Sequence, residues 1–501
     1  MPQRILIERS LTWRQVGEVA DGASLALSDA AQARIRAARA LVESIVSKGV
    51  RAYGVNTGVG ALCDVVIPQS KLEQLSRNIV MSHAVGVGPP LGAAAVRAII
   101  AAAINNFAHG YSGVRLEVID RLLALLEHDC IPEVPTLGSV GYLTHMAHIA
   151  LVLLGAGRAR SHDRIIGGAE ALQSMQFAPL GLAAKEGLSL VNGTPCATGL
   201  SALALGRTQR LLDWADLVAA MTFENLRGQV AVFDGDALGL RTSAGVRHVG
   251  ERLRAALSGS AILRHSAGAR TQDALSLRAV PQVHGAVRDL FAHASRVVDD
   301  ELASVTDNPA VMGTAGAPRA LSGAHAVGTA LGLTVDSLGI AVAELAAMSE
   351  RRIDRLVNPL VSNLPAFLAI DDGAGSGFMI AQYTAVSLVA RNRRLAAPAS
   401  LDGGVTSGLQ EDHLSHATPG ALKLLEIIDN AENIVAIEML AAAQAYDLQR
   451  DSLARAGQTD ALYRRVRALI PQFKDDRPLS ADIQNARRLI GMPPDLSREP
   501  A

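Results

Sequence analysis

The sequence predicts an all-α protein built around a bundle of long helices. Hydrophobic residues make up 49% of the 501 residues and aromatic residues only 3%. A chain rich in Ala and Leu but poor in aromatic residues favours helices over a β-sandwich or barrel. Several long apolar stretches contain almost no Pro, and Ala on one stripe of a helix allows close packing in a bundle. These stretches are 201–221, 285–305, 323–354 and 377–396.

Along the chain we expect three parts. Residues 1–200 form an N-terminal domain that carries active-site loops, 201–460 a central helical bundle, and 461–501 a C-terminal cap. The first part opens on a short strand and a helix, after which helical patterns alternate with loops rich in Gly and Pro. The expected elements are the strand 5–7 and the helices 29–48, 71–82, 92–109, 117–128 and 142–155, with 418–445 as a later helix.

Charge and cysteine content exclude several classes of protein. The chain has 47 Lys and Arg against 48 Asp and Glu, so nucleic acid is not an expected partner. Three scattered cysteines without a CxxC pair predict neither a disulfide framework nor a structural zinc site. The N-terminus lacks the apolar stretch of a secretory signal, and the apolar segment 91–104 is interrupted by Arg97. We therefore expect a cytoplasmic protein that acts on a small molecule away from membranes.

The first cluster of residues that could take part in catalysis is the segment YGVNTGVG at 53–60. Tyr53 precedes several glycines, which indicates a phenol on a tight loop, and Asn56 is a polar neighbour. A tyrosinate can act as a general base if its pKa is lowered. An ordinary Gly-rich turn explains the same pattern.

Four further polar residues suggest substrate contacts. His83 lies near a predicted helix end, and Asn192 follows an apolar run. Gln272 precedes Arg278, whose guanidinium could hold a carboxylate through two hydrogen bonds. A structural histidine, an Asn-Gly turn and a surface ion pair are the alternative interpretations.

The segment Gln410-Glu411-Asp412-His413 places four polar residues in a row after a Gly-rich loop. An acidic cap at a helix N-terminus explains part of this run. His145 and His148 are three residues apart on a predicted helix, but no third ligand is evident. We therefore expect no metal site.

Taken together, these segments resemble the histidine and aromatic amino acid ammonia-lyase family, which has a fumarase-like helical fold. The resemblance covers roughly residues 5–495 and rests on an ordered series of motifs. The motifs are YGVNTGVG (53–60), RNIVMSHAVGVG (77–88), VPTLGSVG (134–141), LVNGT (190–194), QDALSLR (272–278), TDNP (306–309), SERRID (349–354), GSGFMIAQYTA (375–385) and QEDH (410–413).

The resemblance implies roles for individual residues and a homotetramer whose sites are shared between subunits. Tyr53 would take the β-proton, and Glu411 would be the second catalytic residue. Arg278 would hold the substrate carboxylate, and His83 with Glu411 would face an imidazole ring, as in the histidine-using branch. The other implied substrate-binding residues are Asn56, Asn192, Gln272 and Gln410.

The chain departs from the family at the cofactor. In the family, GSVG is followed by Ala-Ser-Gly, which cyclises to an electrophilic methylidene-imidazolone. Here Gly141 is followed directly by Tyr142. Leu275 and Ala326 stand where the family has a Tyr and a Phe, and His325 replaces an Asn. The sequence therefore predicts no cofactor, unless the tripeptide was lost when the sequence was written out.

A chain without the electrophile favours a substrate with its own leaving group. A trimethylammonium departs as neutral trimethylamine and needs a wide pocket, which Leu275 and Ala326 would provide. We therefore expect removal of trimethylamine from ergothioneine, giving thiourocanate, as in the ergothionase branch. Tyr142 and His325 would contact this substrate, Tyr142 through a cation–π interaction.

Two alternatives remain open. One is a histidine or other aromatic amino acid ammonia-lyase whose cofactor tripeptide is missing from the sequence as written. The other is a family relative without catalytic activity. The presence of Tyr53, Arg278 and Glu411 together speaks against the second alternative.

Overall fold

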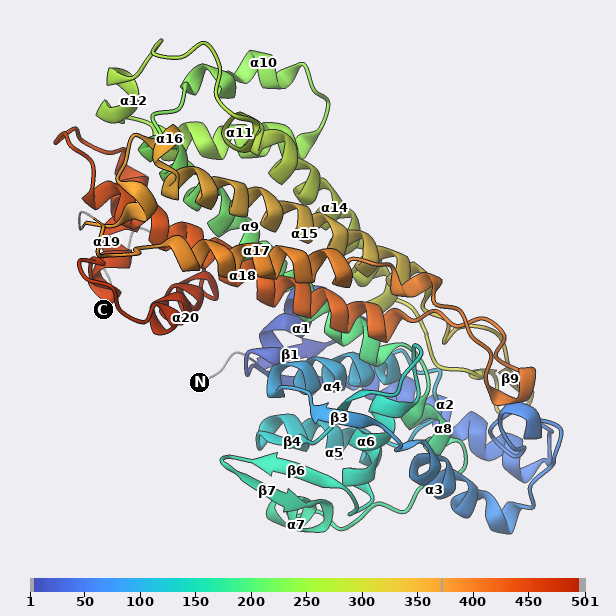
Figure 1. The fold of residues 1–501 in the computed structure, drawn as a ribbon. Coiled ribbons are helices and arrows are strands. Elements are labelled where there is room, and N and C mark those ends of the chain that lie inside the picture. Colours follow the sequence, from blue (N-terminus) through green and yellow to red (C-terminus); the bar gives the residue numbers. More distant parts are fainter. Residues whose placement is uncertain (1–3, 371–372, 495–501) are drawn as a thin grey trace. The chain divides into compact units, whose positions relative to one another are not determined.

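The fold is mostly helical, as the sequence predicts (Figure 1). A computed structural model describes residues 4–370 and 373–494. The predicted helices 29–48, 92–109 and 117–128 correspond to α2 (Asp29–Ser47), α4 (Ala93–Ala108) and α5 (Leu116–Glu127). The all-α class is confirmed.

The described residues form two compact units, each made of separate stretches of chain. Of the described residues, those within 1–206, 294–336 and 398–422 form the first unit, and those within 207–293, 337–397 and 423–501 form the second. The division into three consecutive parts stays a prediction of the sequence. Within the predicted cap, residues 495–501 lie outside the described part of the chain.

Short strands and helices of moderate length make up most of the first unit. Its helices, besides α2, α4 and α5, are α1 (Trp13–Ala20), α3 (Leu72–His83), α6 (Thr144–Leu153), α7 (Gly168–Ser174) and α8 (Glu186–Val191). Its strands are β1 (Arg4–Ile7), β2 (Ser24–Leu27), β3 (Val87–Pro90), β4 (Cys130–Pro132), β5 (Pro135–Leu137), β6 (Arg158–Ser161), β7 (Arg164–Gly167), β8 (Ala310–Gly313) and β9 (Pro318–Leu321). Its 3₁₀ turns are η1 (Gly60–Leu62), η2 (Gln69–Lys71), η5 (Ala399–Leu401) and η6 (Ser407–Leu409).

In residues 4–370 and 373–494, the strands pair into four small sheets rather than one large one. β1 and β2 are parallel, whereas β3 with β5 and β8 with β9 are antiparallel pairs. β4, β6 and β7 form an antiparallel sheet of three strands. Such small sheets fasten loops between helices and do not provide a separate core.

The second unit is helical. Its own elements are α10 (Gly235–Gly239), α11 (Ala244–Leu257), α12 (Ala261–His265), α13 (Leu275–Arg278), α16 (Pro359–Ser362), α17 (Met379–Leu395), α19 (Gly457–Leu469) and α20 (Ser480–Ile490), with the 3₁₀ turns η3 (Val230–Phe233) and η4 (Ala366–Leu368). The long helices α9 (Pro195–Asn225), α14 (Val280–Leu302), α15 (Thr329–Val357) and α18 (Ala417–Asp447) contribute residues to both units. Helices α9, α14 and α15 account for the apolar stretches 201–221, 285–305 and 323–354 of the sequence, and α17 accounts for 377–396.

Helix α2 illustrates how the sequence sets a helix and its buried face. The Ser28 hydroxyl accepts a hydrogen bond from the Ala31 amide and caps the first turn. Ile35, Ala38 and Val42 are buried at spacings of three and four residues, which place them on one face. That face supports the loop of Tyr53.

Arg97 shows why the apolar segment 91–104 belongs to a protein core. The residue is only 5% exposed within α4. Its guanidinium donates to the carbonyls of Val19 and Leu126 and pairs with Asp129 at 3.1 Å. A buried charge requires such partners, and here they are supplied by neighbouring elements of the same unit.

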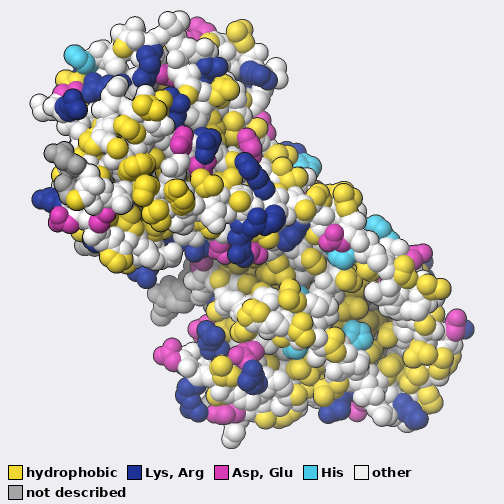
Figure 2. All heavy atoms as spheres, viewed as in Figure 1, with side chains coloured by type: hydrophobic (Ala, Val, Ile, Leu, Met, Phe, Trp, Pro, Cys, Tyr) yellow, Lys and Arg dark blue, Asp and Glu magenta, His cyan; other side chains and the backbone are white. Residues whose placement is uncertain are grey.

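Among the described residues, two helical stretches are long and apolar enough to cross a membrane by length and composition alone. They are Glu186–Asn225 and Thr329–Val357, and 94% and 72% of their most apolar windows are buried in the structure. Such burial is typical of core helices. Hydrophobic side chains are nevertheless exposed among charged ones on the face shown in Figure 2.

Candidate active site

A cavity of about 770 Å³ opens within the first unit, and six of the predicted site residues line it. Its walls come from three stretches of chain that are far apart in the sequence: 53–192, 308–327 and 407–413. The six residues are Tyr53, His83, Tyr142, Asn192, Gln410 and Glu411. The structure therefore brings together a phenol, an imidazole and a carboxylate.

The loop that carries Tyr53 is held by its own polar groups. Asn56 is 7% exposed; its Oδ1 accepts from the Ala52 amide at 2.8 Å and its Nδ2 donates to the Val50 carbonyl at 2.9 Å. Gly54 adopts a φ of +62°, and a Cβ there would lie 2.2 Å from Leu188. Both the conformation and the space require glycine.

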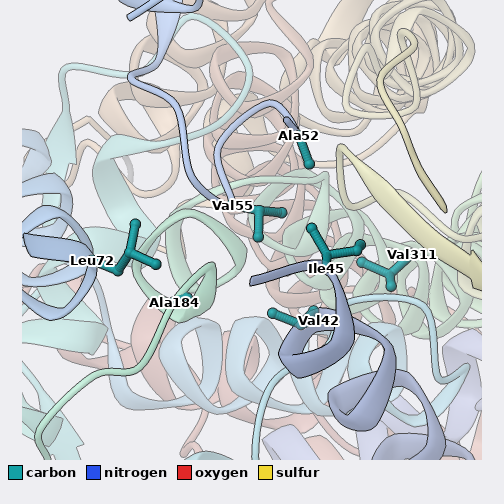
Figure 3. Close-up of a cluster of buried hydrophobic side chains, with 7 residues drawn as sticks. All are labelled: Val42, Ile45, Ala52, Val55, Leu72, Ala184 and Val311. Carbon is teal, nitrogen blue, oxygen red and sulfur yellow. The ribbon is translucent and has the colours of Figure 1, made fainter. Parts of the chain in front are cut away.

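A hydrophobic cluster fixes the two sides of the same loop. Ala52 and Val55, which flank Tyr53, are buried in it. Figure 3 shows Val55 between Leu72 on one side and Ile45 and Val311 on the other. Because interiors are closely packed, this anchoring leaves the backbone of the Tyr53 loop little freedom.

The environment of the Tyr53 hydroxyl acts on its pKa in both directions. Burial raises the pKa above the usual value, and the negative charge of Glu411 adds to this effect. The Gly60 amide donates a hydrogen bond to the Tyr53 Oη at 3.4 Å and partly offsets the rise. The protein groups around Tyr53 therefore do not supply the lowered pKa that a tyrosinate base would need. A cationic substrate would supply the missing stabilisation.

Tyr142 and Glu411 form the second polar pair of the cavity. Burial and hydrogen bonding to Glu411 raise the pKa of Tyr142 to about 12. The phenol therefore stays protonated and donates to the carboxylate. Thr406 Oγ1 donates to Glu411 Oε2 at 3.0 Å, so two hydroxyls orient this carboxylate.

The turn before α6 places Tyr142 in the cavity. Leu143 has a φ of +79° and its amide donates to the Val191 carbonyl at 3.1 Å. The Ser139 hydroxyl donates to the Tyr142 carbonyl at 3.0 Å, and Thr418 Oγ1 donates to the Gly141 carbonyl at 2.8 Å. A left-handed Leu is costly and persists only where its surroundings determine it.

His83 ends α3 and faces the cavity as a neutral ring. Burial lowers its pKa, and the nearby Glu411 charge opposes this effect. Its Nδ1 lies 3.1 Å from the Ser82 hydroxyl. On the following loop, the Gly86 amide donates to His148 Nε2 at 3.0 Å, so His148 supports the His83 segment.

The other predicted site residues do not line this cavity. Asn56 holds the Tyr53 loop instead, and His325 is exposed between two lining residues. Gln272 and Arg278 belong to the second unit, where Arg278 Nη1 donates to the Asp273 carbonyl at 2.8 Å. Substrate contacts by these four residues stay predictions.

Part of the cavity wall escaped the sequence interpretation. Asn308, Ser322, Gly323, Ala324 and Val327 line it, and the Gly323 amide donates to Asn308 Oδ1 at 2.7 Å. Behind the wall, Lys185 and Asp307 form a buried ion pair. The TDNP motif includes Asp307 and Asn308 and was the available signal, but a motif match alone gives no position.

This helical chain, with a phenol, an imidazole and a carboxylate around one cavity, has the groups needed for a proton-abstracting elimination. The protein is a carbon–nitrogen lyase. It belongs to the aromatic amino acid lyase family, whose sequence model matches residues 11–468.

Relatives of known sequence and structure extend over nearly the whole chain. Histidine ammonia-lyase of Deinococcus radiodurans is 44% identical over 490 residues, which cover 96% of this chain and 93% of that protein. The crystal structure of histidine ammonia-lyase from Trypanosoma cruzi has 36% identity and a TM-score of 0.90, covering 98% and 93% of the two chains. Ergothionase from Treponema denticola, solved with desmethyl-ergothioneine sulfonic acid, has 27% identity and a TM-score of 0.90, covering 98% and 99%.

These comparisons overturn the expectation of an ergothioneine-degrading enzyme. Curated relatives at 39–44% identity over nearly the whole chain are named histidine ammonia-lyase, whereas the ergothionase is 27% identical. The expected release of trimethylamine and thiourocanate is therefore wrong. The inference failed because the missing tripeptide tells what the chain cannot build, not which leaving group it binds.

The residues present do not fit a methylidene-imidazolone. The segment contains a single serine, Ser139, which is followed by Val140 rather than by glycine. The Ser139 hydroxyl accepts from the Gly141 amide at 3.1 Å, and the Val140 carbonyl accepts from the His416 amide at 2.9 Å. Cyclisation would have to disrupt these bonds and attack through the amide of a β-branched residue.

Proposed function

We propose that the protein removes the amino group of histidine as ammonia and releases urocanate. The observation that carries this proposal is the presence of His83 and Glu411 in one cavity with the Tyr53 phenol. Glu411 and Asp412 give this cavity two carboxylates, and among the described lining residues there is neither Lys nor Arg. Such a cavity favours a cationic substrate.

Ring binding follows from the charges on the wall. Glu411 attracts a protonated imidazole, and the neutral His83 ring can accept from its N–H. A protonated ring withdraws electrons from the neighbouring carbon. This makes the β-proton more acidic and partly replaces the electrophile that the chain does not build.

The elimination then needs one base. The Tyr53 phenolate accepts the β-proton, the C–H electron pair forms the new double bond, and the C–N pair leaves with the ammonium nitrogen as neutral ammonia. The Gly60 amide, which donates to Tyr53 Oη at 3.4 Å, supports the phenolate. Solvent later removes the proton from Tyr53. No step involves a protein-derived cofactor.

A homotetramer with shared sites is part of the proposal. Ile380, Tyr383 and Val386 on α17 are 57%, 66% and 45% exposed, which favours burial against another subunit. Arg278, which does not line the cavity of its own chain, would reach the substrate carboxylate from a neighbour. A cytoplasmic location stays a prediction.

Selectivity for the ring tests this function. Histidine should form urocanate with a kcat/KM at least about 10²-fold above that of phenylalanine, because the phenylalanine ring offers no N–H to Glu411 or His83. Steady-state absorbance assays of both substrates measure the ratio. Glu411→Leu should narrow the ratio, and equal or better turnover of phenylalanine by the wild type would reject the imidazole assignment.

The pH dependence of kcat at saturating histidine should show a rising alkaline limb. In the bound complex, where the substrate ring and α-ammonium are held protonated, only the phenolate of Tyr53 accepts the β-proton, so kcat increases with pH through the pKa of Tyr53, which burial raises. Glu411→Gln removes a charge that raises this pKa, and the limb should move to lower pH. Asp412→Asn is the matched control, since Asp412 lines the cavity but does not raise the pKa of Tyr53. A limb that stays in place in Glu411→Gln would contradict the assignment.

A further inference from the structure

A fully buried ion pair lies behind the cavity wall. Lys185 Nζ is 2.9 Å from Asp307 Oδ2, and both side chains are 0% exposed. Lys185 Nζ also donates to Ser189 Oγ at 2.8 Å, and Ser189 Oγ donates to the Ser112 carbonyl at 3.1 Å. Neither charged residue lines the cavity. Burying two charges is costly, so a role beyond stability deserves a test.

The second oxygen of Asp307 connects this pair to the cavity. Asn192, which is 6% exposed and lines the cavity, donates through Nδ2 to the Asn308 carbonyl at 2.6 Å and to Asp307 Oδ1 at 3.5 Å. Both partners are acceptors. The amide nitrogen of Asn192 must therefore point toward them, since the opposite orientation would place oxygen against oxygen.

This orientation leaves the amide oxygen of Asn192 for the ligand. No described residue donates a hydrogen bond to Asn192 Oδ1. The atom is also not one of the fully buried polar atoms that lack a partner, so it is not fully buried. It is therefore accessible from the cavity. An amide oxygen is an acceptor only and binds an N–H donor, whereas a carboxylate would be repelled.

The substrate offers one suitable group besides its ring. The ring faces Glu411 and His83 in the proposed function, which leaves the α-ammonium and the carboxylate. We propose that Asn192 Oδ1 accepts a hydrogen bond from the α-ammonium, and that Lys185 and Asp307 are positioning residues that hold the Asn192 amide in this orientation. This inference rests on the proposed function, because it assumes that an imidazole amino acid occupies the cavity.

Two analogues that each lack one group of histidine distinguish a contact with the ammonium from a contact with the carboxylate. Histamine has the ring and the amine without a carboxylate, and imidazolepropionate has the ring and the carboxylate without an amine. Titration calorimetry with the full-length protein measures both Kd values without turnover. Asn192→Leu should raise the Kd of histamine by at least about tenfold and the Kd of imidazolepropionate by no more than about twofold. A loss of this size is expected for one hydrogen bond to a charged group.

The positioning role is tested in the double variant Lys185→Met/Asp307→Asn. Removing both charges avoids an uncompensated buried charge, and melting curves with circular dichroism report whether the fold is kept. The Kd of histamine should rise by about three- to tenfold, while the Kd of imidazolepropionate stays unchanged. Asp129→Asn, which breaks the Arg97 ion pair in the same unit, is the matched control and should change neither Kd.

Each other outcome has a defined meaning. If Asn192→Leu raises the Kd of imidazolepropionate and leaves that of histamine unchanged, Asn192 binds the carboxylate and the inference is wrong. If the folded double variant binds both ligands as the wild type does, the positioning role is wrong. If the wild type binds neither compound, the proposed function fails, and the inference falls with it. Should Lys185→Met/Asp307→Asn not fold, Asp307→Glu replaces it, because the longer carboxylate keeps the charge but shifts the oxygen that faces Asn192.

Discussion

Replacing Tyr53 with Phe is expected to lower kcat by roughly 10²–10⁴-fold, the usual contribution of a positioned general base. The substitution removes only the hydroxyl, which within the described part of the chain accepts one hydrogen bond, from the Gly60 amide at 3.4 Å. The chain on both sides of the ring stays anchored by the buried Ala52 and Val55, so the fold should be kept. Steady-state assays with histidine measure kcat, and the melting temperature reports the fold.

A comparison with Cys63 sharpens this result. Cys63 lines the same cavity, and its charge would act on the pKa of Tyr53. Cys63 is therefore a rival candidate for the base. Near-normal kcat in Tyr53→Phe together with a large loss in Cys63→Ala would move the base from the phenol to the thiol.

Mixing two inactive variants should restore activity. Tyr53→Phe lacks the base, and Arg278→Ala lacks the proposed partner of the substrate carboxylate. If each site of a tetramer takes these residues from different subunits, random mixing leaves both groups intact in about a quarter of the sites. Co-expression with two affinity tags isolates the mixed oligomers, and their activity is compared with that of each parent.

The comparison with the parents decides how the site is assembled. Recovery from nearly zero to about a quarter of the wild-type rate is the expected result. Mixed oligomers that stay as inactive as both parents would show that one chain supplies both residues, or that Arg278 does not contact the substrate. Size-exclusion chromatography with light scattering confirms that the mixture is tetrameric.

The helices were largely predictable from the sequence, because burial leaves a pattern in neighbouring residues. The run of buried residues in α2 repeats every three or four positions, and α4 is apolar on nearly every side. The hairpin of β6 and β7 was missed. Its strands contain Arg158, Arg160 and Arg164, and such short polar strands have no clear alternation.

The site was predictable in its residue types but not in its geometry. Tyr53, His83, Asn192 and Glu411 were identified from motifs, and the structure brings them to one cavity. The ion pair of Lys185 and Asp307 joins residues 122 positions apart, and no local pattern marks such a pair. The direction of the Tyr53 pKa shift was also inaccessible, since it depends on burial and on Glu411.

One measurement tests the central claim, namely that this chain converts histidine with its own side chains. Protein whose intact mass agrees with the 52.3 kDa of the sequence is mixed with histidine, while urocanate absorbance and released ammonia are recorded together. The account predicts equal amounts of both products, lost in Tyr53→Phe. Absence of urocanate at every pH, or a chain heavier than its sequence by a cyclised tripeptide, would contradict it.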